Sequence, residues 1–368
     1  MDLYPYKFTP IYQERIWGGR NLARLFGRPL PQGMRVGESW ELADLPGGVS
    51  VVANGPRAGG TLTELTRELG PALLGNARPA PDGRFPLLLK YLDAQDKLSL
   101  QVHPDAESAS RLGGDARPKT ECWYVVESRR GFLYKGIRPR VTPGRFLHAV
   151  ETDRAEEVVR RFEAAAGDFH YLPAGMVHAL GAGVVVAEIQ TPSDTTYRVT
   201  DWGRGRDTHL EQAKQCIRVG KGLDKAPGRR GARLVQHESF GVMRMGRGEL
   251  LCKDPGRCVA IMHVQGRGPL RVAWGWERRQ VAHDEIAVGQ TVLLPSALRA
   301  VVVPSDDSTY LAIWPGAVPS PVFGERQAAG ERPLPHPPLP NRPRGTRTAR
   351  KGMAPRATGV RRARTKRK

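Results

Sequence analysis

The sequence has few of the features that define several large protein classes. Four cysteines are spread over 368 residues, and no two of them have CxxC spacing. A chain of this length can bury a core without disulfides, so we expect free thiols and a cytoplasmic protein. No apolar run approaches the roughly 20 residues of a membrane helix. The first residues, MDLYPYKFTPIYQ, lack the basic and apolar regions of a signal peptide. We therefore expect no membrane association.

Acidic residues are nearly absent from the C-terminal end. Residues 331–368 hold 13 Lys and Arg but one acidic residue, whereas the first 330 residues hold 44 basic and 36 acidic residues. The tail thus supplies most of the formal charge of +20. From about Val318 the composition is rich in Pro, Arg and Gly, which predicts disorder. Such a tail is suited to weak, nonspecific nucleic-acid binding. A translated extension without a selected role is the alternative.

The chain lacks long helical patterns and is rich in short apolar runs separated by Gly and Pro. SLQVHP, CWYVV, VVVAEIQ and TVLLP are typical of these runs, and their β-branched content favours strands. Two stretches, 61–74 and 153–166, have apolar residues at helical spacing behind a Thr and an Asp cap. We predict a mainly β fold, a sandwich or jelly roll, with a few helices.

A weak internal sequence repeat predicts two β units. GDFHYLPA from Gly167 resembles GQTVLLPS from Gly289, since each is a Gly turn, a strand and a Pro turn. We expect a larger domain with helical insertions at 1–234 and a smaller β domain at 235–317. A disordered tail at 318–368 would follow, and the protein would be a monomer. Position 299–300, which aligns with His178, offers Arg and Ala, so the second unit should bind no metal.

The segment GDFHYLPAGMVH reads G-x5-P-x-G-x2-H, a metal-binding motif of the cupin superfamily. The motif implies cupin-type jelly-roll barrels, with a catalytic cupin domain at 1–234 and a cupin-like β domain at 235–317. Its glycine opens a strand, Pro173 and Gly175 reverse the chain, and His178 begins the next strand facing the barrel interior. A lone histidine in a β protein is more often structural, but the four fixed positions favour a ligand here.

Two further segments offer ligands. In LSLQVHPD, Gln101 and His103 are two positions apart and so face one side of a strand. In KTECWYVV, Lys119 and Glu121 share a face in the same way, and Glu121 would supply an anionic ligand.

Together with ERIWGG, GESWELAD and EIQTPSDTTYRVTDWGR, these segments resemble, in order, the short bacterial form of type I mannose-6-phosphate isomerase. The resemblance covers roughly residues 1–315. It implies a zinc enzyme that interconverts mannose 6-phosphate and fructose 6-phosphate through a cis-enediol(ate). One Zn²⁺ per chain would be held by His103, Glu121 and His178, with Gln101 as a weaker fourth ligand.

The resemblance also implies which residues act on the sugar. Arg198 matches the active-site arginine of the family, and Asp194 would assist ring opening or orient Arg198, although SD is also a good turn sequence. Lys90 and Lys119 match lysines that contact phosphate or the enediolate, and either could have a lowered pKa. Ser99 would help to bind phosphate, while the proton-transferring base stays open.

Two other classes of protein fit these residues less well. A cupin oxidoreductase using Fe²⁺ would not need the cations Lys90, Lys119 and Arg198, which suit a phosphorylated, oxyanion-forming substrate. A non-catalytic sugar-responsive protein would not need an intact ligand set. The remaining histidines, Cys122, Trp123 and Tyr124 have no predicted function; the two aromatic residues should lie in the core.

Overall fold

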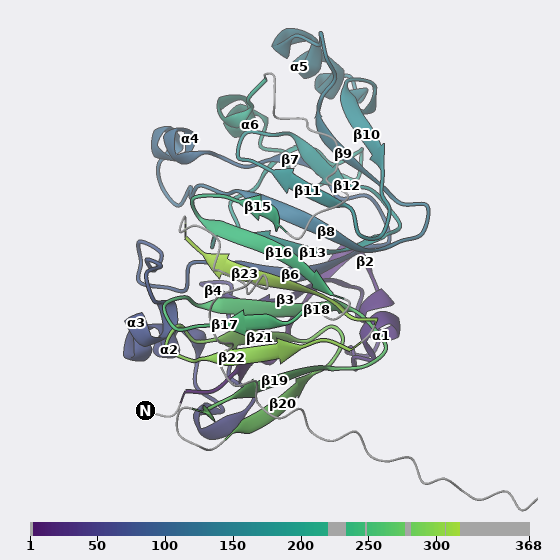
Figure 1. Ribbon diagram of the computed structural model, residues 1–368. Helices are drawn as coiled ribbons and strands as arrows, with labels where there is room; N and C mark the ends of the chain where they lie inside the picture. The colour runs from purple at the N-terminus through teal and green to yellow at the C-terminus, as the bar shows by residue number, and fades with distance from the viewer. Residues whose placement is uncertain (1–2, 220–232, 247–248, 277–280, 306, 317–368) are drawn as a thin grey trace, which may run out of the picture. The chain divides into compact units, whose positions relative to one another are not determined.

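The computed structural model describes residues 3–219, 233–246, 249–276, 281–305 and 307–316. The predicted tail, 318–368, lies outside these ranges. The described residues belong to one compact unit. Within it the described residues are mainly strands, which confirms the predicted fold class, and four large sheets carry the architecture (Figure 1).

Two sheets form the barrel nearer the N-terminus. One has the order β11-β8-β13-β6-β3-β2 and the other β10-β9-β12-β7-β14. The strands of the first sheet are β2 (Ile11–Gly19), β3 (Val36–Leu42), β6 (Leu88–Ala94), β8 (Glu121–Ser128), β11 (Phe169–Leu172) and β13 (Val184–Gln190). Those of the second are β7 (Leu100–Val102), β9 (Phe132–Ile137), β10 (Val159–Glu163), β12 (His178–Leu180) and β14 (Tyr197–Thr200).

Two further sheets form the second β unit, with the orders β1-β21-β18-β23-β16-β15 and β17-β22-β19-β20. Their strands are β1 (Tyr6–Lys7), β15 (Arg233–Gln236), β16 (Phe240–Gly246), β17 (Leu251–Lys253), β18 (Val259–Gln265), β19 (Leu270–Trp274), β20 (Ala282–Ile286), β21 (Thr291–Leu294), β22 (Ala300–Val303) and β23 (Thr309–Pro315). The N-terminal strand β1 pairs with β21, so the first residues of the chain complete a sheet of the second unit. A small ribbon, β4 (Asp44–Leu45) with β5 (Gly48–Val49), lies apart from these sheets.

Helices are short and peripheral among the described residues. They are α1 (Asn21–Phe26), α2 (Leu62–Leu69), α3 (Pro71–Leu74), α4 (Ala106–Leu112), α5 (Pro143–Glu151) and α6 (Leu210–Cys216), with single 3-10 turns η1 (Gly55–Arg57) and η2 (Ala155–Glu157). None of the described helices is long and apolar enough to cross a membrane. Figure 1 shows α5 and α6 beside the sheet of β7, β9 and β12, where both pack against its outer face.

One of the two predicted helices forms as expected and the other does not. Thr61 caps α2 in a capping box with Glu64, and Gly70, at a φ of +47°, separates α2 from α3. The prediction of a helix at 153–166 was wrong. Asp153 has a φ of +55°, which is incompatible with an extended N-cap, and most of the segment becomes η2 and β10. Pairing of β10 with β9 outweighs the local helical pattern.

Strand β13 shows why the central sheet is buried on both faces. Val184 and Val186 face the barrel interior, while Val185, Ala187 and Ile189 join a cluster with residues of β16, β18 and β23. The two β units therefore share one apolar core. Since side chains alternate along a strand, Glu188 follows Val186 into the barrel. The same alternation brings Lys90 of β6 and Glu121 and Trp123 of β8 to this interior face, which positions the site.

Candidate metal centre and substrate cleft

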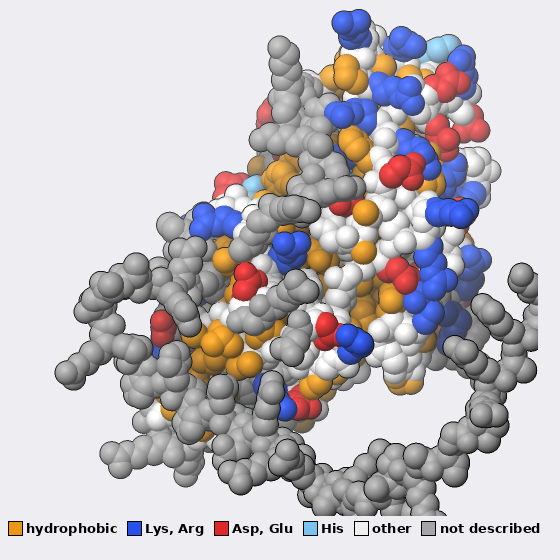
Figure 2. All heavy atoms as spheres, turned by 45° about the vertical axis from the view of Figure 1, so that its right-hand side comes forward, with side chains coloured by type: hydrophobic (Ala, Val, Ile, Leu, Met, Phe, Trp, Pro, Cys, Tyr) orange, Lys and Arg blue, Asp and Glu red, His pale blue; other side chains and the backbone are white. Residues whose placement is uncertain are grey.

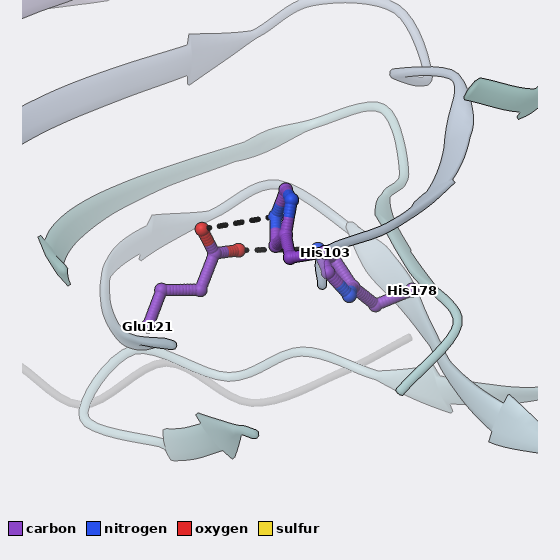
Figure 3. Close-up of side chains that lie close together, drawn as sticks. All are labelled: His103, Glu121 and His178. Carbon is purple, nitrogen blue, oxygen red and sulfur yellow. Dashed lines mark ion pairs between the residues drawn. The ribbon is translucent and has the colours of Figure 1, made fainter. Parts of the chain in front are cut away.

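Three of the predicted ligands converge inside the first barrel. His103 follows β7, Glu121 begins β8 and His178 begins β12, and all three side chains are buried. Their ligand atoms lie within 4.8 Å of one another. Glu121 bridges the two imidazoles, with Oε2 3.3 Å from His103 Nε2 and Oε1 3.2 Å from His178 Nε2 (Figure 3). No other such cluster of His, Cys, Asp and Glu occurs among the described residues, those of the second β unit included.

Backbone contacts orient both imidazoles toward the centre. His103 Nδ1 lies 3.0 Å from the Thr195 carbonyl oxygen, and His178 Nδ1 lies 2.8 Å from that of Met176. Donation from each Nδ1–H to a carbonyl leaves the Nε2 lone pair free to bind a metal. The motif around His178 thus provides its own anchor, because Met176 lies in the Pro-Gly turn that precedes the strand.

The electrostatics also suit a cation. Burial, and then the charge of Lys119, lower the pKa of His103 to about 3, which keeps this imidazole neutral. Burial opposes ionisation of Glu121, but Lys119 and His103 hold its pKa well below its usual range. His103 Nε2 and both carboxylate oxygens of Glu121 are buried without hydrogen-bond partners. Two imidazoles and a carboxylate with orphaned atoms fit a divalent metal such as Zn²⁺.

Gln101 lies next to this cluster, as its predicted place on the same strand requires. Its side-chain Nε2 is 3.3 Å from His178 Nε2. A half-turn of the terminal amide would place Oε1 there instead, and this oxygen could then serve as the weaker fourth ligand.

The other predicted residues meet in a cleft of about 580 Å³ that opens beside the metal centre. Its lining includes all of the predicted substrate and catalytic residues: Lys90, Ser99, Lys119, Asp194 and Arg198, together with Gln101. Ser99 and the two lysines are buried, whereas Asp194 is exposed. These residues come from four separate segments of the chain, so only the fold brings them together.

The pKa of Lys90 is shifted in the direction opposite to the expected one. Its ammonium lies 3.4 Å from Glu38 and 3.3 Å from Glu188, and 5.4 Å from the ring centre of Trp40. Burial alone would lower the pKa of Lys90, but the two carboxylates raise it above its usual value. The expected lowering is therefore wrong for this lysine, which stays protonated at neutral pH.

Sequence reasoning gave no role to the carboxylates of this network. Glu38 accepts from Arg15 Nε at 2.8 Å and from Trp40 Nε1 at 2.7 Å, and Glu188 accepts from Trp123 Nε1 at 2.8 Å. Burial works against the charge of Glu38, but Lys90 and Arg15 lower its pKa to about 2. GESWELAD and EIQTPSD supply these residues, so the signal was present within the quoted motifs. It did not reveal which lysine the two glutamates would meet.

Arg198 is held at the cleft by its backbone and by one end of its side chain. Its N–H donates to His209 Nδ1 at 3.1 Å, and its Nη1 donates to the Asp207 carbonyl oxygen. Its Nε is buried without a hydrogen-bond partner. Arg198 also lines the cleft, so its guanidinium group is placed to meet an anionic ligand there.

The two β units and the buried His–Glu–His cluster define a cupin-type protein with a candidate metal site. A family model described as the catalytic domain of type I phosphomannose isomerase matches residues 6–125. Mannose-6-phosphate isomerase ManA of Bacillus subtilis is 39% identical over 228 residues, which cover 60% of this chain and 70% of that protein. The Streptococcus mutans mannose-6-phosphate isomerase is 38% identical, with 58% and 68% covered.

Solved structures agree. The crystal structure of mannose 6-phosphate isomerase from Bacillus subtilis superimposes with a TM-score of 0.71 at 29% identity, over 84% of this chain and 99% of that one. The chain belongs to the type I mannose-6-phosphate isomerase family.

Proposed function

We propose that this chain is a zinc-dependent aldose–ketose isomerase that interconverts mannose 6-phosphate and fructose 6-phosphate. The observation that carries the proposal is the buried His103–Glu121–His178 cluster, with orphaned ligand atoms, beside a cleft lined by cations. The named relatives act as mannose-6-phosphate isomerases, which gives the substrate class. In this proposal residues 1–234 carry the chemistry and residues 235–317 bind no metal.

The ligand set would hold one ion, with Gln101 as a fourth ligand after rotation of its amide. Bound Zn²⁺ would supply Lewis acidity toward the sugar oxygens. Two histidines, a carboxylate and an amide oxygen are ligands that zinc accepts.

The protein's own groups would handle the charge that appears when a proton moves between C2 and C1. An aldose–ketose conversion of this kind passes through a cis-enediol(ate), which needs cationic donors at its oxygens. Arg198 lines the cleft, and a guanidinium keeps its charge at all relevant pH values. Lys90, held protonated by Glu38 and Glu188, can donate to a substrate oxygen but cannot accept the proton at neutral pH.

Asp194 and Lys119 complete the catalytic set that we propose. Asp194 lies at the exposed edge of the cleft four residues before Arg198, where it could assist ring opening. Lys119 lies 3.0 Å from Glu121 and lines the cleft, so it can support the charge of this ligand while it faces substrate. Ser99 offers a hydroxyl from the same wall.

A coupled assay with mannose 6-phosphate, combined with metal analysis, tests substrate and metal together. Chelation should abolish turnover, and added Zn²⁺ should restore it. Full turnover by protein shown to be free of metal would refute zinc dependence. Restoration by Fe²⁺ together with oxidation of substrate, and no isomer formed, would instead favour the oxidoreductase class.

We further propose that the enzyme is a cytoplasmic monomer and that the basic segment 318–368 plays no part in catalysis. Its charge supports weak binding to polyanions as a side activity. Figure 2 shows Lys and Arg side chains in patches over the visible described surface as well. A salt-sensitive interaction with DNA that disappears on truncation at Val318 would support the role of the tail.

A further inference from the structure

The loop that follows β14 forms part of the cleft wall. Its seven residues, 201–207, read DWGRGRD, and the structure describes all of them. The motif that contains Arg198 extends into this loop, yet none of its residues has been given a function. Arg206 is the loop residue that lines the cleft, on the wall that also carries Arg198.

Asp201 fixes the side chain of Arg206. Arg206 Nε donates to Asp201 Oδ2 at 2.8 Å, and Nη2 donates to Oδ1. Asp201 is 3% exposed and also accepts from Arg204 Nη2 at 2.8 Å. Burial works against the charge of Asp201, but the bonds from Arg206 and Arg204 lower its pKa, so it stays ionised. The pair uses two of the five N–H donors of Arg206 and leaves three for another acceptor.

The loop is also attached to the neighbouring segment of the cleft. Trp202 Nε1 donates to the Leu98 carbonyl oxygen at 2.6 Å, and Arg204 Nη1 donates to that of Lys97 at 2.7 Å. The ammonium of Lys97 lies 4.4 Å from the ring centre of Trp202. Ser99, which lines the cleft, follows directly. The loop is therefore preorganised, and a ligand that meets Arg206 need not order it first.

Charge at the cleft is unevenly balanced. The deeper cations already have carboxylate partners: Lys90 has Glu38 and Glu188, and Lys119 has Glu121. On the loop wall, Arg204 and Arg206 share Asp201 as their carboxylate partner, and Asp207 is a further carboxylate that acts on Arg198. The pKa of Arg198 is lowered, first by burial and then by the positive charge of Arg206. The two neighbouring guanidinium groups of Arg198 and Arg206 provide a place for an anion.

We propose that Arg206 binds the phosphate group of the substrate, with Asp201 as its positioning residue. The inference rests on the proposed function for the identity of the substrate. A phosphate monoester carries about −1.5 to −2 charges at neutral pH and accepts well from the planar edge of a guanidinium. Ser99, on the attached segment, would donate to the same group. Arg206 would thus set the preference of the cleft for phosphorylated over free sugars.

The test is Arg206→Gln, which removes the charge and keeps a polar side chain of similar reach. A charge-assisted hydrogen bond lost from a phosphate site predicts a rise in KM for mannose 6-phosphate of about 10- to 100-fold, with kcat changed only a few-fold. The inhibition constant of inorganic phosphate should rise by a similar factor. The kcat/KM for unphosphorylated mannose, measured at high concentration, should stay as in the unmodified protein. Arg206→Lys should recover part of the affinity.

Arg154→Gln is the matched control. Arg154 donates Nε and Nη2 to Glu157 at 2.8 and 2.6 Å, the same two-point pairing, but it is exposed and does not line the cleft. It should leave both KM values unchanged. Thermal unfolding and zinc content of each variant separate loss of binding from loss of fold. For the positioning role, Asp201→Asn should raise KM for mannose 6-phosphate and leave kcat/KM for mannose unchanged.

Unchanged KM and unchanged phosphate inhibition in Arg206→Gln would overturn the inference, and so would equal losses for mannose and mannose 6-phosphate. If the unmodified protein turned over neither sugar, the proposed function would fail, and calorimetry with inorganic phosphate alone would still decide the role of Arg206. Binding that is lost in Arg206→Gln and kept in Arg154→Gln would support an anion site. Equal binding by both variants would refute it.

Discussion

Lys90 offers the sharpest test of how the cleft is held together. Replacing it by methionine keeps the length and most of the apolar stem but removes the ammonium between Glu38 and Glu188. Glu38 would retain Arg15 at 2.8 Å and Trp40 at 2.7 Å. Glu188 would retain the hydrogen bond from the Trp123 indole N–H at 2.8 Å. The loss of folding stability should therefore come mainly from Glu188, whose side chain is 5% exposed and would be left without a paired cation.

The expected size follows from that geometry. Removing one partner of a buried ion pair typically costs about 3–5 kcal/mol, because the other charge is left in a poorly solvated place. Since Glu38 keeps a cation, we expect the lower end, about 3 kcal/mol, for Lys90→Met at pH 7.5. Adding Glu188→Gln removes the stranded charge and keeps an acceptor for Trp123, so the double variant should recover more than half of the loss.

The pH dependence has a definite sign. Burial and then Glu121 already raise the pKa of Glu188, and without Lys90 it should rise further. A carboxyl group with a raised pKa in the folded state binds its proton there first, so the deficit of Lys90→Met should shrink as pH falls from 7.5 toward 5. At the alkaline end, the raised pKa of Lys90 means that its contribution is present below about 10.5 and is lost as pH rises above that value.

Urea unfolding followed by tryptophan fluorescence, at equal zinc occupancy, measures these differences. A loss below about 1 kcal/mol in Lys90→Met would show that the ion pairs are solvated and contribute as surface pairs do. Failure of Glu188→Gln to restore stability would show that the loss arises elsewhere, and the reasoning about the stranded carboxylate would be wrong.

Four further predictions follow from the site and the core. Alanine at any of the three ligand positions should remove zinc and turnover, whereas Gln101→Ala should retain more of both, as metal analysis would show; equal occupancy in all four variants would contradict the assignment. Arg198→Lys should keep zinc but lower kcat about 10²–10³-fold, because lysine lacks the planar fork of donors, and near-normal kcat would refute a catalytic role. His170 is buried with both ring nitrogens unpaired, and burial lowers its pKa to about 3. Since the unfolded chain binds the proton first, stability should fall by up to about 1.4 kcal/mol per unit as pH drops from 6.5 toward 3, and His170→Leu should flatten this slope while exposed His148→Gln does not. Deleting 331–368 should leave kcat and KM for mannose 6-phosphate nearly unchanged and weaken retention on a polyanionic resin; loss of zinc or turnover would show that the tail supports the catalytic barrel.

Much of the metal centre could be predicted from the sequence because its signals are local. The Gly-Pro-Gly pattern before His178 fixes a turn that presents the imidazole, and alternation along a strand places Lys119 with Glu121. Regular β structure between Gly and Pro turns likewise predicts the fold class. In each case the information lies within about a dozen neighbouring residues, where turn chemistry and strand periodicity are decisive.

Features that depend on distant partners could not be predicted in this way. The sequence around Lys90 does not show that Glu38 and Glu188 flank it, because β3 and β13 meet β6 only in the folded sheet. The raised pKa of Lys90 follows mainly from that pairing. The same holds for the segment 153–166. Its local pattern favours a helix, but hydrogen bonding of β10 with the distant strand β9 makes most of it extended. The role inferred for Arg206 could likewise not be predicted, because it depends on the hydrogen bonds by which Asp201 holds this side chain in the cleft wall.

Pairing of β1 with β21 has a consequence for how the protein is made. Tyr6, which is fully buried, pairs with Leu293, near the other end of the folded unit. Translation proceeds at about 5–20 residues per second, so the N-terminal strand must wait roughly 15–60 s for its partner to leave the ribosome. During that time the first barrel can assemble its own sheets, while its outer face and the aromatic N-terminal segment stay uncovered. This interval is when chaperones would have the greatest effect on the yield of native protein.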